Sequence, residues 1–94
     1  MAVYRITRFA ASDMGKVGEF TEAMRSELES LGADFIDLIS YGNGKGVVIA
    51  KYLDQAASDA ASATASKVFA EMMEAGIVEK DSVHPHMGEV FNSF

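Results

Sequence analysis

The chain has 94 residues, a formal net charge of −6 and no cysteine. Its length predicts one domain over residues 1–94. The excess of acidic residues argues against binding to a nucleic-acid backbone, which needs clustered Lys and Arg. No apolar run approaches the roughly 18 residues that a membrane span requires, and residues 1–12 lack the pattern of a signal peptide. Together with the lack of disulfides, these features predict a cytoplasmic protein that binds neither nucleic acid nor membrane.

Residues 2–11 alternate along an extended chain and carry apolar groups on both sides, which predicts a strand whose two faces are both covered. Ser12 and Asp13 follow at a helix N-cap position, because their side-chain oxygens can accept the free N–H groups of a first turn. Apolar residues then recur at spacings of three and four as far as Leu31. This pattern predicts one helix from Asp13 to Leu31, which Gly32 ends in the left-handed conformation.

The segment from residue 33 to residue 53 carries two apolar runs on either side of a glycine-rich loop. The β-branched and aromatic residues of both runs suit a pleated, half-buried surface. Gly42, Asn43 and Gly44 can adopt the positive φ angles of a tight reversal. The segment therefore predicts a β-hairpin. Its loop is interpreted as a turn and not as a phosphate cradle, because it joins two strands instead of opening a helix.

Asp54 is the predicted cap of a second helix from Gln55 to Ala75, whose first half is unusually small-sided. Two interpretations stay open: the helix packs closely on a sheet there, or the small residues leave room for a ligand. A substitution of Ala61 by Phe separates them, since it would block a ligand in the second case and overpack the core in the first. A last strand is predicted from Val83 to Phe91, on a sheet edge because Pro85 cannot donate to a ladder.

The predicted order βαββαβ is a split βαβ arrangement. Right-handed crossovers place the strands in the order 4-1-3-2, antiparallel, with both helices on one face. The strands are nevertheless apolar on both sides, whereas a solvated face would alternate cleanly with polar residues. The sequence therefore predicts an α+β, ferredoxin-like fold that forms a homodimer through sheet-on-sheet packing.

In element order, length and doubly apolar strands, nearly the whole chain resembles the dimeric α+β barrel superfamily, which includes the antibiotic biosynthesis monooxygenase-like proteins. Members include cofactor-independent monooxygenases of polyketide quinones, haem-degrading enzymes, stress-responsive barrels and many proteins of no known activity. In the enzymes, the pocket generally lies between the sheet and its own helices. The resemblance implies a small-molecule pocket in that place.

The active residues of these enzymes do not transfer to this chain. The haem-degrading members use an Asn, a Trp and a His, but this chain has no tryptophan, and its first strand offers Arg5, Thr7 and Arg8 where the Asn is expected. The quinone monooxygenases often combine Trp, Tyr, Asn and Arg, of which Tyr and Arg are present in the strands. The catalytic residues stay unknown, and no cofactor is expected.

His84 and His86 lie two residues apart and therefore on one face of a regular strand. No third ligand can be grouped with them, so no metal site is predicted. Either histidine is a candidate acid, base or hydrogen-bond donor in a pocket, and the alternative is a place at a strand start or subunit contact. Four charges also fall inside apolar strands, where they could form cross-strand ion pairs, protect a sheet edge from pairing or serve in a pocket; ion pairs are the expected role. The four charged residues are Arg5, Asp37, Lys51 and Glu89.

Two functions follow from the resemblance and the residues together. The first is binding of an aromatic or otherwise apolar small molecule, with or without cofactor-independent monooxygenase-like activity. The second is a non-catalytic homodimeric binding, scaffold or stress-responsive barrel. The candidate pocket lies inside each subunit near the small-sided half of the second helix, and Arg5 or Arg8 is its candidate anchor for an acidic or phenolic ligand. The candidate pocket residues are Arg5, Phe20, Met24, Tyr41, Ala61, Met72, His84 and His86.

Overall fold

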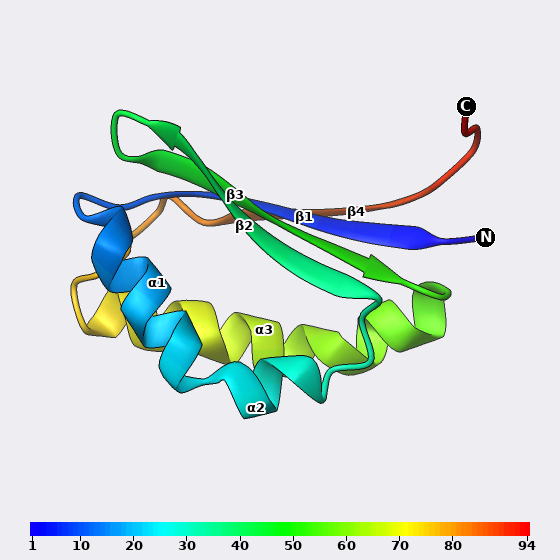
Figure 1. Ribbon diagram of the computed structural model, residues 1–94, viewed down its shortest axis with the longest axis horizontal. Helices are drawn as coiled ribbons and strands as arrows, with labels where there is room; N and C mark the ends of the chain where they lie inside the picture. Colours follow the sequence, from blue (N-terminus) through cyan, green and yellow to red (C-terminus); the bar gives the residue numbers. More distant parts are fainter.

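The computed structural model describes residues 1–94 as one four-stranded sheet with every helix on the same face (Figure 1). The elements in chain order are β1 (Val3–Ala10), α1 (Met14–Ala23), α2 (Arg25–Glu29), β2 (Phe35–Gly42), β3 (Lys45–Tyr52), α3 (Gln55–Glu74) and β4 (His84–Glu89). The strand order is β2-β3-β1-β4 and every pairing is antiparallel. The predicted fold class and its order 4-1-3-2 are thereby confirmed.

The hairpin of β2 and β3 closes through a two-residue loop, since Gly42 pairs with Lys45. Asn43 and Gly44 between them have φ angles of 46° and 77°, the pair of positive values that matches the twist of two antiparallel strands. The predicted hairpin is present.

Pro85 lies on the edge strand β4, opposite Thr7, as predicted. Proline has no backbone N–H to donate, and edge strands tolerate this because they pair on one side only.

The predicted single helix from Asp13 to Leu31 is wrong in its middle, because the helix breaks at Met24 into α1 and α2. Met24 leaves the helical region with φ −105° and ψ 16°, and its N–H bonds the Thr21 carbonyl. The Thr21 hydroxyl donates to the carbonyls of Val17, at 2.8 Å, and of Gly18, at 3.2 Å. Threonine side chains that bond back in this way compete with the helical ladder and bend helices, which apolar periodicity alone does not reveal.

The small-sided half of α3 packs closely on the sheet at Ala61. This residue is only 1% exposed and lies in a cluster with Ala50 and Tyr52 of β3. Of the two interpretations of the alanine-rich segment, close packing therefore holds at this position. The larger part of the core lies at the second half of α3, where Val68 and Met72 pack with Phe9 of β1 between the sheet and the helices.

Because Ala61 is buried against Ala50 and Tyr52, we expect Ala61→Phe to destabilise the fold by about 1–3 kcal/mol through overpacking. Ala63→Phe is the matched control, because Ala63 lies on the exposed side of the same helix and should change stability by less than about 0.5 kcal/mol. Urea denaturation of both variants measures the difference. Equal stability of Ala61→Phe and the wild type would show that a gap exists there after all.

The second face of the sheet carries no helix (Figure 1). We call it the open face. Cross-strand partners share a face, so three rows run across it from β2 to β4. These rows are Phe35–Lys51–Tyr4–Gly88, Asp37–Ile49–Ile6–His86 and Ile39–Val47–Arg8–His84. Ile6 on the inner strand β1 is 39% exposed, and Ile39 and Phe35 on the edge strand β2 are 39% and 38% exposed, so the open face offers apolar surface to solvent in its middle and along one edge.

Candidate functional site

A small cavity of about 50 Å³ lies between the sheet and the helices. Its walls come from β1, β2 and β3 on one side and from α1, α2 and α3 on the other, and most of them are apolar. Arg5, Thr7 and Thr21 are the polar exceptions, and Tyr52 also lies in the wall. An apolar hollow with a few polar groups is the usual form of a small-molecule site, although this volume is far below that of a drug-sized ligand.

A larger open cleft of about 460 Å³ lies against α1, α2 and the edge strand β2. The cleft and the cavity share four lining residues, which are Thr21, Leu28, Ile36 and Leu38. The two spaces are therefore neighbours and share part of their walls. A ligand that displaced these four side chains would reach from solvent into the interior.

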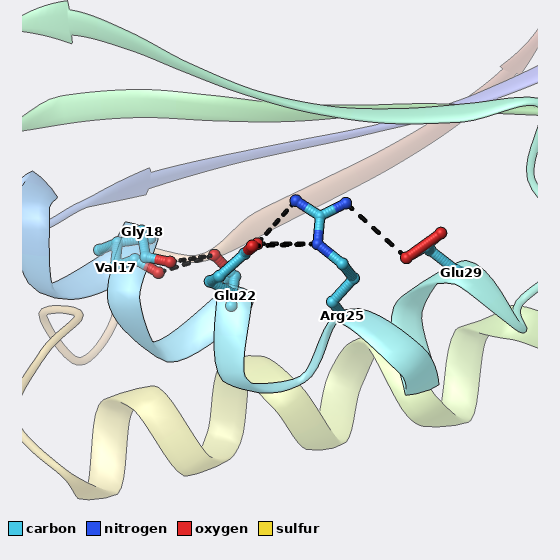
Figure 2. Close-up of polar contacts among 6 residues, drawn as sticks. Val17, Gly18, Glu22, Arg25 and Glu29 are labelled. Carbon is cyan, nitrogen blue, oxygen red and sulfur yellow. Dashed lines mark hydrogen bonds and ion pairs between the residues drawn. The ribbon is translucent and has the colours of Figure 1, made fainter.

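The break between α1 and α2 lines this cleft. Figure 2 shows Arg25 between Glu22 near the end of α1 and Glu29 at the end of α2, on the side of the helices that faces the sheet. Its Nε and Nη2 donate to the Glu22 carboxylate at 3.0 Å and 2.7 Å, and its Nη1 lies 3.7 Å from Glu29. The bond from Arg25 holds the pKa of Glu22 below its usual value. Because these side chains are exposed, the network stabilises the break only slightly.

Arg5 is the most unusual side chain of the cavity. It comes from β1, an inner strand, and is 8% exposed. Its Nη1 donates to Ser62 Oγ at 2.6 Å and lies 4.0 Å from the sulfur of Met87. Its Nε is buried without any partner, and no carboxylate lies within 4.0 Å of the guanidinium. A buried charge without a counter-charge is costly.

Tyr52 is the acidic group near Arg5, and it does not neutralise the arginine. Burial raises the pKa of the Tyr52 hydroxyl above its ordinary value, and the positive charge of Arg5 only partly offsets this effect. The phenol therefore keeps its proton at neutral pH. The interior beside Arg5 consequently holds one positive charge and no negative one.

The expected cross-strand ion pairs form for none of the four charges inside the strands. Only Lys51 has an acidic partner, and it is Asp34, 4.0 Å away and outside the strands. Asp37 and Glu89 are exposed, so water solvates their charges. Arg5 is the one charge that is both buried and unpaired.

The eight candidate pocket residues do not lie together in the structure. Arg5 and Met72 line the cavity. Phe20 and Met24 pack against the neighbouring core, while Ala61 sits in the close contact described above.

The other three candidates lie elsewhere. Tyr41 is 62% exposed at the irregular end of β2. His84 and His86 are exposed on the open face, paired with Arg8 and Ile6. These three side chains are not brought together with Arg5.

Three polar residues of the cavity, Thr7, Thr21 and Tyr52, are not among the eight candidate pocket residues, although Tyr52 is one of the strand tyrosines that the sequence offered. Thr7 lies two residues after Arg5 and therefore on the same face of the strand, so period-two alternation was the signal that could have found it. Tyr52 faces the same way through its register with Val3, which depends on long-range pairing that the sequence does not state. In α3, the cavity is lined by Ala65, Val68, Phe69 and Met72, mostly beyond the alanine-rich half.

The structure contains no cluster of three or more His, Cys, Asp or Glu side chains able to hold a metal ion. It also contains no helix that is long and apolar enough to cross a membrane.

Solved structures resemble this fold over nearly the whole chain. A protein described as dimeric and ferredoxin-like, from an uncultured marine organism, has a TM-score of 0.67 at 15% identity, covering 99% of this chain and 90% of that one. NE2512, a protein of unknown function from Nitrosomonas europaea, has a TM-score of 0.64 at 15% identity, with 99% and 92% covered. Rv0793 from Mycobacterium tuberculosis has a TM-score of 0.58 at 18% identity, with 99% and 98% covered.

The sequence itself matches no protein-family model and no curated protein. At the identities above, the structural likeness establishes the fold and nothing finer. The chain is therefore a ferredoxin-like α+β protein, in agreement with its strand order and its one-sided helices.

Proposed function

We propose that residues 1–94 form one domain of a cytoplasmic homodimer that binds a small apolar molecule inside each subunit, between the sheet and its helices. The observation that carries the proposal is the apolar cavity with a buried, unpaired arginine in its wall. Its contact with the open cleft supplies a route from solvent. The resemblance to the antibiotic biosynthesis monooxygenase-like proteins supports the same location.

The homodimer is supported by the composition of the open face. Apolar side chains occupy its middle, and charged or polar ones such as Asp37, Arg8, His84 and His86 lie towards its borders. An apolar centre with a polar rim is the usual anatomy of a protein interface. The C-terminal tail turns towards the side of the open face (Figure 1) and exposes Phe91 and Phe94, which adds apolar surface there. We expect the interface to bury more than about 1,200 Å² in total.

A dimeric scaffold without a ligand is the second candidate, and one observation favours it. The enclosed cavity of about 50 Å³ is smaller than the roughly 300 Å³ of typical ligand sites, so a ligand must push side chains apart. Monooxygenase-like chemistry is the finer form of the first candidate. We assign no catalytic residue to it, because apart from Arg5 the cavity offers only hydroxyl groups.

A thermal-shift screen of small aromatic and aliphatic compounds tests the proposal. A bound compound at about one hundred times its Kd should stabilise the protein by about 2.7 kcal/mol, which corresponds to a Tm increase of about 10–20 °C for a domain of this size. Ala65→Leu adds a larger side chain to the wall of the cavity and should remove the increase in Tm. Ala63→Leu, on the exposed side of α3, should keep the increase. If no compound raises the Tm at millimolar concentration, the scaffold is the better description.

A further inference from the structure

The unpaired edge of Arg5 indicates what kind of group the cavity receives. A guanidinium binds a carboxylate most strongly with two parallel N–H groups. Arg25 in this same chain does so, because its Nε donates to Oε1 of Glu22 at 3.1 Å and its Nη2 donates to Oε2 of Glu22 at 2.7 Å. Arg5 uses only Nη1, towards Ser62 and Met87, and leaves both Nε and Nη2 without a protein partner. The edge that chelates a carboxylate at Arg25 is thus free at Arg5.

We infer that the site selects a small monocarboxylate with an apolar body, whose carboxylate pairs with the free edge of Arg5. This inference rests on the proposed function and adds the chemical class of the ligand. The cavity of about 50 Å³ has room for the head group, and the apolar body extends towards the adjoining cleft through the shared wall at Leu28 and Ile36.

The acidic residues that line the cleft do not prevent a carboxylate ligand from entering it. Glu22 and Glu29 both lie against Arg25, and Asp34 lies against Lys51. Each acidic residue that lines the cleft therefore has a basic neighbour within 4.0 Å. In the interior, Ser62 accepts one N–H of Arg5 and fixes the guanidinium in place, which lowers the entropic cost of binding an anion.

Matched pairs of probes test the charge selection. The pairs are hexanoate and hexanamide, 3-phenylpropionate and 3-phenylpropionamide, and 2-naphthoate and 2-naphthamide, titrated by calorimetry at pH 7. Within at least one pair, we expect the acid to bind the wild type at least tenfold more tightly than the amide. Arg5→Met should abolish the preference for the acid while keeping the affinity for the amide. Arg5→Lys should retain part of the preference, because lysine keeps the positive charge but lacks the two parallel N–H donors of a guanidinium. Lys67→Met, which removes one exposed positive charge from α3, should leave the preference unchanged.

The possible outcomes separate the two proposals. If amides or other neutral compounds bind but no acid is preferred, the monocarboxylate inference is wrong and the apolar site stands. If Arg5→Met keeps the preference, the inference is equally wrong. If neither member of any pair binds the wild type at 10 mM and the thermal-shift screen is also negative, both proposals fail. The acid–amide comparison in the wild type decides the matter even if Arg5→Met does not fold.

Discussion

If the proposed sheet-on-sheet homodimer forms, replacing Ile6 by Glu should convert it into a folded monomer. Ile6 lies on the inner strand β1 in the middle row of the open face, between Ile49 and His86. Because a two-fold axis relates the two subunits of a sheet-on-sheet dimer, the substitution places two glutamates in the interface. A charge buried without a partner costs about 3–5 kcal/mol, so the dimer dissociation constant should increase by at least about a hundredfold.

Sedimentation equilibrium at micromolar concentration measures this change, and circular dichroism checks that the monomer is folded. Ala63→Glu is the matched control, because it introduces the same charge on the exposed side of α3, away from the open face. It should leave the dimer intact. A wild-type monomer, or an Ile6→Glu variant as dimeric as the wild type, would contradict the proposed interface.

In the absence of ligand, Arg5→Met should stabilise the protein by about 1–4 kcal/mol, the range found when buried charged groups are replaced by apolar ones of similar size. The physical reason is that the wild type buries a guanidinium whose Nε has no partner and that has no neighbouring carboxylate. Methionine has the length and flexibility to fill the same space. The Ser62 hydroxyl loses its contact with Arg5 but keeps its bond to the Ser58 carbonyl at 3.2 Å.

Urea denaturation of the ligand-free wild type and variant, at one protein concentration because the protein is a proposed dimer, measures the effect. Lys67→Met is the comparison, since Lys67 is exposed on α3 and away from the open face, and its replacement should change stability by less than about 0.5 kcal/mol. A loss of more than about 1 kcal/mol in Arg5→Met would show that the Ser62 bond makes Arg5 a structural residue. A gain fits a binding site, where residues that destabilise the free protein are expected.

The fold could be predicted because its signals are local. Both N-caps, at Asp13 and Asp54, accept backbone N–H groups as expected, and Gly32 and Gly76 both have positive φ angles near the helix ends. The turn at Asn43 and Gly44 likewise depends on short-range chemistry. The break at Met24 escaped prediction because it results from a side-chain competition at Thr21 within an otherwise regular apolar stripe.

The candidate site was harder to predict because it depends on register. A shift of one residue in pairing moves every side chain of a strand to the other face, and the sequence alone did not place His84 and His86 on the open face rather than beside Arg5. Arg5 itself was a candidate, and its location beside α3 follows from its contact with Ser62, 57 residues away. The absence of a carboxylate partner is visible only once all strands and helices are in place.

The location of the ligand site can be tested most directly by an NMR titration of the wild-type protein with 3-phenylpropionate. If the ligand binds between sheet and helices, the largest shift changes occur at Arg5 Hε and at the methyl groups of Leu28, Ile36 and Val48, which line the cavity. Signals of Ile6, Ile39 and His86 on the open face should change little. Large changes confined to the open face, with Arg5 and Val48 unaffected, would contradict a site inside each subunit.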